Sequence, residues 1–257
     1  MISRPNISND LKSGRLGNKL FMIAACIGVA EIYNDTIAIE PGQYSKYLPN
    51  IPYQQNIKID KIYVEPTFTY NPIPYSPNLG IIGYFQSEKY FSHCKDKIRK
   101  YFDPAPFVKE YANNIWKEIG IKPENENITV IQVRRDDYLE KSDYHTVQTL
   151  EYYKEAMNII QSKTSVYLIF CDQTAIPWCK ENFKGDNIII APQDHYFNDI
   201  YVMSQCSNYI IANSTFGWWG AWLNPSDKKT VIAPKNWFGP AAQLDDKDLI
   251  PEGWIRI

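Results

Sequence analysis

The sequence predicts an α/β fold whose second half forms a parallel, doubly wound sheet. From residue 128 onward, short apolar runs alternate with helical patterns, an order typical of parallel strands joined by helices. The first run, 128–133, has the length and β-branched composition of a buried strand. Several runs end in polar residues, as expected where the carboxyl ends of parallel strands border a ligand crevice.

The second half divides into strands and helices of ordinary length. The expected strands after 128–133 are 166–170, 187–191, 209–212 and 231–233, and the expected helices are 149–160, 176–183, 197–206 and 216–223. A helical pattern separates successive strands, so each connection can be the crossover that parallel pairing requires.

The beginning of the chain combines one helix with an irregular stretch. Residues 21–33 are apolar and free of proline, which predicts a buried helix. Gly14 and Gly17 precede this helix in a loop that lets backbone amides approach a ligand. The prolines and tyrosines of 41–77 predict long loops with a short strand near 61–65.

The remaining elements of the first half lead to a predicted linker. We expect a strand at 80–86 and helices at 90–102 and 106–119. The polar segment K-P-E-N-E-N at 122–127 then indicates a domain boundary. The sequence therefore predicts two domains, 1–124 and 125–257.

Composition narrows the classes of function. The net charge of -2 gives no basic footprint for nucleic acid. Five cysteines without a C-x-x-C pair indicate reduced thiols, and three histidines without ligand spacing predict no metal site. No apolar run approaches the length of a membrane span, and the start lacks a secretory signal, so we expect a cytoplasmic protein.

The predicted strand 128–133 ends in charged residues. Arg134, Arg135, Asp136 and Asp137 follow it directly. Arginine suits phosphate binding because its planar guanidinium donates hydrogen bonds in pairs and keeps its charge. R-R-D-D can also be a self-neutralising surface turn, and this motif alone does not decide between the two interpretations.

Polar residues also precede two later helices. Asn213, Ser214 and Thr215 lie where the helix 216–223 begins, and there they can cap the helix or help to seat an anion. Asp199 lies near the start of the preceding helix, where a carboxylate suits the helix dipole even without a ligand. Three tryptophans of the helix 216–223, Trp218, Trp219 and Trp222, share one face and are expected in the core rather than in a sugar platform.

Three stretches together resemble one family. G-R-L-G-N-K-L-F at 14–21, V-I-Q-V-R-R-D-D-Y-L at 130–139 and I-I-A-N-S-T-F-G-W-W-G-A-W-L-N at 210–224 are similar to the motifs of the α-1,2-fucosyltransferases, glycosyltransferase family 11. They occur in the family's order, within a resemblance that spans 14–236. This resemblance implies a GT-B-like fold of two Rossmann-type α/β domains with parallel sheets and with GDP-fucose bound between them.

The family's activity is implied by the same resemblance. It is the transfer of L-fucose, with inversion, from GDP-fucose to the 2-hydroxyl of a terminal galactose in a glycan. The resemblance implies no metal and no cofactor. GDP-fucose is implied as the donor substrate. The resemblance assigns the acceptor to the first domain and the donor to the second.

Individual roles follow by matching the family's motifs to this chain. Arg134 is implied to hold the donor diphosphate, and Arg135 to orient neighbouring structure. The other residues implied to bind the donor are Gly17 and Asn18 at the phosphates, Asn213, Ser214 and Thr215 at the helix start, and Gln132 and Asp199 near the nucleotide.

The chain departs from the family's pattern in its motifs. Gln132 replaces a histidine beside the nucleotide, which puts base recognition in question. Asp136 replaces a glycine and adds a carboxylate near the diphosphate, where Arg135 can neutralise it. Lys19 replaces a glutamine and adds positive charge, and the segment 3–12 represents the family's first strand poorly.

The candidates for catalysis are Arg134, Asp137 and Asn18. Asp137 can act as the general base or only as the partner that orients Arg134, and Glu140 and His145 are rival bases. Two other functions stay open. One is a GDP-fucose-dependent transferase with another acceptor linkage, and the other is a non-catalytic nucleotide- or glycan-binding relative.

Overall fold

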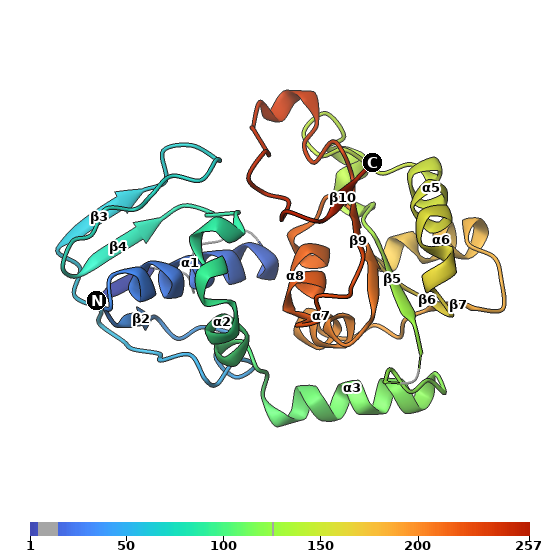
Figure 1. Cartoon of the computed structure of the whole chain (residues 1–257), viewed down its shortest axis with the longest axis horizontal. Helices are drawn as coiled ribbons and strands as arrows, with labels where there is room; N and C mark the ends of the chain where they lie inside the picture. Colours follow the sequence, from blue (N-terminus) through green and yellow to red (C-terminus); the bar gives the residue numbers. More distant parts are fainter. Residues whose placement is uncertain (5–14, 125) are drawn as a thin grey trace. The chain divides into compact units, whose positions relative to one another are not determined.

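The computed structural model describes residues 1–4, 15–124 and 126–257, which form two compact α/β units. Unit 1 comprises Met1–Val108 and Asp245–Pro251, and unit 2 comprises Lys109–Leu244 and Glu252–Ile257. Each unit contains one sheet, and every strand pairing in both sheets is parallel (Figure 1). The predicted α/β class with parallel sheets is confirmed.

Unit 1 contains a four-stranded sheet in the order β2-β1-β4-β3. The strands are β1 (Ile2–Arg4), β2 (Ile37–Ile39), β3 (Lys61–Val64) and β4 (Leu79–Ile82). Strand β1 lies in the interior, because Ile2 pairs with Ile37 on one side and with Leu79 on the other. The sequence prediction missed β1 and β2, which are only three residues long and carry no alternating pattern.

Helix α1 (Leu16–Ile32) forms the core of unit 1 against β1 and β2. It is apolar on all sides, and nearly every residue from Leu16 to Ala30 is buried. A Cβ atom at Gly28 would lie 2.0 Å from the carbonyl oxygen of Tyr90, so glycine lets the following segment pack directly on the helix. The helix begins five residues before the predicted start, whereas Gly14 lies outside the described residues.

Short helices follow β4. They are the 3₁₀ turns η2 (Glu88–Tyr90) and η3 (Ser92–Cys94), then α2 (Lys95–Tyr101) and α3 (Pro106–Glu118). The predicted helix 90–102 is therefore divided into 3₁₀ turns and one α-helix, while the helix predicted at 106–119 forms almost as expected.

Unit 2 contains a six-stranded sheet in the order β10-β9-β8-β5-β6-β7. The strands are β5 (Ile128–Val133), β6 (Val166–Cys171), β7 (Ile188–Ile190), β8 (Asn208–Ile210), β9 (Val231–Ala233) and β10 (Ile255–Arg256). Strand β5 is buried along its whole length between β6 and β8, which explains its uninterrupted apolar character.

Helices cover both faces of this sheet (Figure 1). Helices α5 (Leu150–Ile160) and α6 (Ile176–Asn182) lie on one face, and α7 (Tyr196–Ser204) and α8 (Thr215–Leu223) lie on the other. The shorter elements are α4 (Asp136–Glu140) and the 3₁₀ turns η4 (Gln161–Lys163), η5 (Gln173–Ala175) and η6 (Pro240–Ala242). The doubly wound arrangement predicted for the second half is thus present.

The tryptophans of α8 belong to the core. Trp218 and Trp219 are fully buried and Trp222 is 3% exposed. The rings of Trp218 and Trp222 stack with centroids 5.9 Å apart, and Trp219 meets Trp218 edge-on. These side chains therefore pack inside unit 2 and do not offer a surface for a sugar.

The division between the units differs from the predicted boundary at 124. Helix α3 joins unit 2 from Lys109 onward, where Trp116 Nε1 donates to Gln205 Oε1 at 2.5 Å. The late segment Asp245–Pro251 belongs to unit 1, because the Asp248 carboxylate accepts from the Tyr70 amide at 2.9 Å and pairs with Lys89. Asp248 therefore anchors this late segment within unit 1.

None of the helices in the described ranges has the length and apolar character needed to cross a bilayer.

Candidate functional site

Arg134 follows β5 directly, and two carboxylates hold its guanidinium. Its Nη1 donates to Asp172 Oδ1 and its Nη2 donates to Asp137 Oδ1. Arg134 is 7% exposed, so its charge is largely removed from water and requires such partners. Asp136 Oδ2 lies 4.0 Å from Nη1, which places a third carboxylate beside the same cation.

Asp172 enters the site because β5 and β6 are neighbours in register. Val133 pairs with Cys171, so the residues that follow the two strands meet at the carboxyl edge of the sheet. Asp172 Oδ2 accepts the backbone amides of Arg135 at 2.8 Å and of Asp136 at 3.1 Å. One carboxylate therefore fixes both the Arg134 side chain and the start of α4.

The sequence analysis missed Asp172, although a signal was available. Asp172 is the first acidic residue after the apolar run 166–171, just as Arg134 is the first charged residue after 128–133. Adjacent parallel strands place their carboxyl ends side by side, so an acidic residue at the end of one strand is a candidate partner for an arginine at the end of its neighbour.

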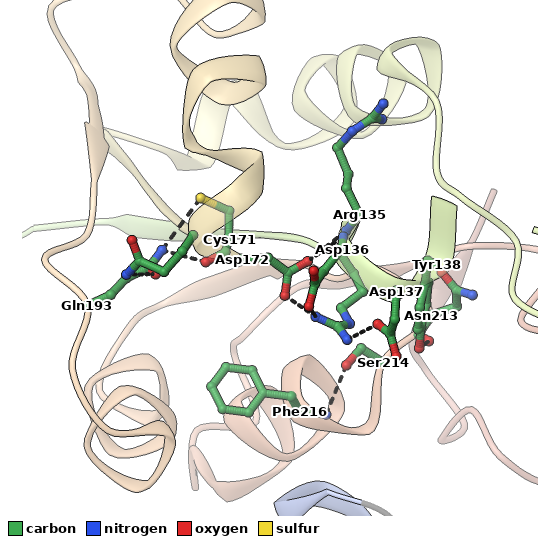
Figure 2. Close-up of polar contacts among 12 residues, drawn as sticks. Arg135, Asp136, Asp137, Tyr138, Cys171, Asp172, Gln193, Asn213, Ser214 and Phe216 are labelled. Carbon is green, nitrogen blue, oxygen red and sulfur yellow. Dashed lines mark hydrogen bonds and ion pairs between the residues drawn. The ribbon is translucent and has the colours of Figure 1, made fainter. Parts of the chain in front are cut away.

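Arg135 points away from the carboxylates. Figure 2 shows Asp136, Asp137 and Asp172 grouped together, with the Arg135 side chain directed elsewhere. Its Cζ atom lies 4.3 Å from the centroid of the Trp178 ring on α6, a cation–π contact. The structure places Asp136 near Arg134, whereas Arg135 is engaged with Trp178.

The helix start at Ser214 lies in the same part of unit 2 (Figure 2). Ser214 Oγ accepts the Phe216 amide at 3.4 Å and caps α8. Ser214 and Thr215 are half-buried, so a ligand can still approach the beginning of this helix.

The Asn213 side chain is occupied within the fold. Its Nδ2 donates to the Trp237 carbonyl at 2.8 Å, and its Oδ1 accepts from Gln148 Nε2 at 3.1 Å. Its backbone carbonyl accepts from the Tyr138 hydroxyl at 2.9 Å. Asn213 therefore ties α4 to the residues before α8.

Gln132 also makes contacts inside the fold. It is buried, and its Oε1 accepts the Ala212 amide at 3.1 Å. A Cβ atom at Gly217 would lie 2.9 Å from the same oxygen, so this glycine leaves room for the glutamine. Gln132 thus joins β5 to the segment between β8 and α8.

Asp199 on α7 is a buried carboxylate with an unused acceptor. It is 9% exposed, and within the described part of the chain its Oδ1 has no hydrogen-bond partner. Burial raises the pKa of Asp199 to about 7, and the negative charge of Asp194 acts in the same direction. The neighbouring Asn198, which the sequence analysis did not single out, likewise has an Oδ1 without a partner among the described residues.

Gly17 and Asn18 lie in the first turn of α1 in unit 1. Asn18 Oδ1 accepts from Gln86 Nε2 at 3.1 Å. Lys19, which adds a positive charge in this turn, is buried at 9% exposure. Gln86 was predicted only as the end of a strand, yet its side chain is hydrogen-bonded to that of Asn18.

The three candidate bases lie in different surroundings. Asp137 is paired with Arg134, and its side chain is 33% exposed. The His145 ring stacks on Tyr138 with centroids 4.3 Å apart, and burial lowers the pKa of His145 below its usual value. Glu140 is exposed at the end of α4. No group of three or more His, Cys, Asp or Glu side chains in the described ranges could hold a metal ion.

Residues 15–257 match the family model described as glycosyl transferase family 11. The chain belongs to this family. An α-1,2-colitosyltransferase from Escherichia coli is 27% identical over 95% of this chain and 97% of that protein. Galactoside α-(1,2)-fucosyltransferase 1 from Saimiri boliviensis boliviensis is 23% identical over 83% of this chain, and this match spans 64% of that relative. The resemblance seen in the three motifs is confirmed.

Solved structures extend this result to the fold. POFUT1 in complex with GDP aligns with a TM-score of 0.56 at 10% identity, covering 90% of this chain and 97% of that one. NodZ α-1,6-fucosyltransferase soaked with GDP-fucose aligns with a TM-score of 0.51 at 14% identity, covering 87% of this chain and 92% of that one. This glycosyltransferase family 11 protein therefore has the GT-B-like architecture that its motifs implied.

Proposed function

We propose that this family 11 protein transfers L-fucose from GDP-fucose to the 2-hydroxyl of a terminal galactose, with inversion and without a metal. The observation that carries the proposal is Arg134, a buried arginine at the carboxyl end of the central strand β5. Membership of glycosyl transferase family 11 and the name of the primate relative support the reaction and the acceptor.

The chemistry explains why an arginine is needed there. As the bond between fucose C1 and the diphosphate oxygen breaks, its electron pair leaves with GDP and the sugar becomes oxocarbenium-like. The galactose 2-hydroxyl oxygen forms the new bond and releases its proton to a base. Arg134 and the start of α8 at Ser214 can stabilise the growing negative charge on the diphosphate.

Binding of the diphosphate requires a change of partners around Arg134. The guanidinium is paired with Asp137 and Asp172, and Asp136 adds a third negative charge nearby. Asp172 is also held by two backbone amides, whereas Asp137 is the more exposed partner. We therefore propose that Asp137 yields its place to the donor diphosphate while Asp172 keeps the guanidinium in position.

The decisive experiment measures GDP release from GDP-fucose with and without lactose. Wild-type protein should show release that lactose stimulates, and NMR of the product should identify an α-1,2 linkage. A different linkage would support another acceptor position. GDP binding without turnover across a panel of galactosides would instead support a binding protein.

The colitosyltransferase from Escherichia coli suggests a second donor, because its match covers nearly the whole of both chains. Colitose is fucose without the 3-hydroxyl. Competition between a fucosyl and a colitosyl donor gives the ratio of the two kcat/KM values. This ratio shows which of the two sugars the protein transfers preferentially. A site that hydrogen-bonds the 3-hydroxyl should strongly reject the donor that lacks it.

The unused acceptors on α7 support recognition of a guanine base. Guanine presents N1–H and an exocyclic amino group, and the oxygens Asn198 Oδ1 and Asp199 Oδ1 could accept from them. An ionised Asp199 would accept most strongly. We propose that these two residues hold the base of GDP-fucose.

This assignment predicts that donor affinity depends on pH. Since the pKa of Asp199 is raised to about 7, the carboxylate is mostly protonated at pH 6 and mostly ionised at pH 8. The affinity for GDP-fucose should therefore rise about tenfold from pH 6 to pH 8. Calorimetric titration of wild type and Asp199→Asn measures this, and the variant should show a flat profile. A flat profile in the wild type would contradict the assignment.

Asp137→Asn distinguishes a general base from an orienting partner. An asparagine oxygen can still accept from Arg134 Nη2, so we expect turnover to stay within about tenfold of wild type if Asp137 is a partner. Steady-state kinetics and GDP binding are measured together. A loss of kcat by about 10³-fold or more with unchanged GDP affinity would identify Asp137 as the base.

A further inference from the structure

Two cysteines of unit 2 lie together at the carboxyl end of β6. Cys171 is the last residue of this strand, and Cys179 lies on α6, which packs against it. Both are free thiols, and the Cys179 thiol is hydrogen-bonded to the Cys171 sulfur. Cys179 is fully buried, whereas Cys171 is half-buried. A reagent can therefore reach Cys171 first, where a second thiol is already in contact with it.

Gln193 is a second hydrogen-bond donor to the Cys171 sulfur. Its Nε2 lies 3.5 Å from Sγ and also donates to the Cys171 carbonyl oxygen (Figure 2). Because a carbonyl oxygen only accepts hydrogen bonds, this second contact fixes the amide with its nitrogen toward Cys171. The hydrogen bond from Cys179, helped by the one from Gln193, lowers the pKa of Cys171 despite partial burial and the nearby Asp172 charge. The thiolate is the reactive form of a cysteine, so Cys171 is activated.

Cys179 is the protonated partner in this pair. Its hydrogen bond to Cys171 and its burial raise the pKa of Cys179, and the positive charge of Arg135 opposes them. Arg135 lies over the ring of Trp178, the residue before Cys179, with Cζ 4.3 Å from the ring centroid. Cys171 is therefore suited to attack an oxidant, and Arg135 can assist the later loss of the Cys179 proton.

We propose that Cys171 and Cys179 are a redox-active pair that hydrogen peroxide converts to a disulfide and that small thiols reduce again. The Cys171 thiolate attacks one peroxide oxygen and breaks the O–O bond, which with one proton gives a sulfenic acid and water. The Cys179 sulfur then attacks the Cys171 sulfur, and the sulfenic oxygen leaves as a second water. Two thiols and one peroxide thus give one disulfide and two waters, and the two electrons that the sulfurs lose reduce the peroxide.

Oxidation of the pair affects Asp172, the next residue in the chain. A covalent S–S bond is shorter than the hydrogen bond that it replaces, so Cys171 has to move toward α6. The Asp172 carboxylate holds Arg134 and two backbone amides, and a shift of the preceding residue weakens these contacts. The disulfide therefore loosens the Asp172–Arg134 pair. An effect on fucose transfer rests on the proposed function, whereas the disulfide itself does not.

Disulfide mapping tests the pair without turnover. Native protein is treated with hydrogen peroxide, alkylated in denaturant, digested without reduction and analysed by mass spectrometry. We expect one bridge, Cys171–Cys179, which dithiothreitol removes, while the buried Cys26, Cys94 and Cys206 are alkylated. In Cys179→Ser, dimedone should instead trap a sulfenic acid on Cys171. An unmodified Cys171 in the wild type, or oxidation of all five cysteines at equal rates, would overturn the proposal.

Gln193→Leu tests the source of the reactivity. Loss of its hydrogen bond to the sulfur should slow alkylation of native Cys171 by iodoacetamide about fivefold. Gln161→Leu, at an exposed glutamine of unit 2, is the matched control and should react like wild type. Both variants should keep the wild-type thermal midpoint. Equal rates in the two variants would exclude Gln193 as an activating donor.

Equilibration with glutathione tests the link to Arg134. Glutathione disulfide and the two protein thiols give the protein disulfide and two molecules of glutathione, so the bridged fraction yields an equilibrium constant. Because coupling is reciprocal, Arg134→Met should raise this constant about tenfold, since no ion pair then opposes the disulfide. Lys154→Met, which removes an exposed cation of unit 2, should leave it unchanged. Equal constants in wild type and Arg134→Met would overturn the link.

Fucose transfer supplies the last readout. Peroxide should lower kcat/KM for GDP-fucose about tenfold, and dithiothreitol should restore it, because a loosened Arg134 stabilises the diphosphate less well. Cys171→Ser should lose this response. Unchanged transfer by the bridged protein would contradict the effect on Arg134. A wild type that transfers no fucose would instead contradict the proposed function, and the mapping and the glutathione equilibrium would still decide the redox pair.

Discussion

Replacing Arg134 with alanine is expected to slow fucose transfer about 10²–10³-fold, the usual cost of removing one well-placed donor to developing charge. The loss should fall on kcat, because the diphosphate becomes most negative when the bond to fucose breaks. GDP release from GDP-fucose in the presence of lactose measures the effect. Turnover close to wild type would contradict the assignment of Arg134.

Arg134→Lys separates charge from geometry. Lysine keeps the positive charge but lacks the planar fork that can donate to two groups at once. In this protein the fork contacts Asp172 with Nη1 and Asp137 with Nη2, so a lysine cannot keep one partner and release the other in the same way. We expect Arg134→Lys to remain strongly impaired.

Arg135→Lys is the matched control for this experiment. The Arg135 guanidinium lies over Trp178, and a lysine ammonium can also interact with an aromatic face. The substitution should therefore leave transfer within a few-fold of wild type. A comparison of the thermal midpoints of both variants distinguishes loss of chemistry from loss of folding. Equal impairment of the two lysine variants would mean that the arginines act together.

Strands that coincide with long apolar runs could be predicted from the sequence, and so could the residues at their ends. The run 128–133 is buried on all sides between two partners, so its composition identified β5 and placed Arg134 at the edge of the sheet. Strands β1 and β2 are three residues long, too short for composition or alternation to identify. The compact units divide at residue 108, inside α3, where the sequence continues as one uninterrupted helix.

Residue type did not predict which side chains of the motifs are hydrogen-bonded inside the fold. Gln132 and Asn213 lie within the family motifs, yet their side chains hold Ala212 and Trp237 inside the fold. Asp172 lies outside those motifs and holds the central arginine. Partners of this kind come from segments distant in sequence, and only strand order and register bring them together.

Asp172→Ala should cause the largest loss of stability among these substitutions. It leaves the buried Arg134 guanidinium without one carboxylate and removes the acceptor of the Arg135 and Asp136 amides. Breaking a buried ion pair by removing one partner costs about 3–5 kcal/mol. Denaturant unfolding of wild type and variant measures the difference, and an unchanged midpoint would show that the pair contributes little.

A double-mutant cycle with Arg134→Met resolves that loss into its parts. Without the cation, Asp172→Ala removes only the acceptor of two backbone amides, so its cost should fall by roughly half. The cost of Asp172→Ala that remains in the Arg134→Met background measures the stabilisation of the start of α4. The difference between its costs in the two backgrounds measures the buried ion pair. If the cost is the same in both backgrounds, Asp172 stabilises α4 alone, and the orientation of Arg134 must come from Asp137. The more exposed Asp137 would then have to hold the guanidinium as the diphosphate binds, which is incompatible with its release to make room for the donor.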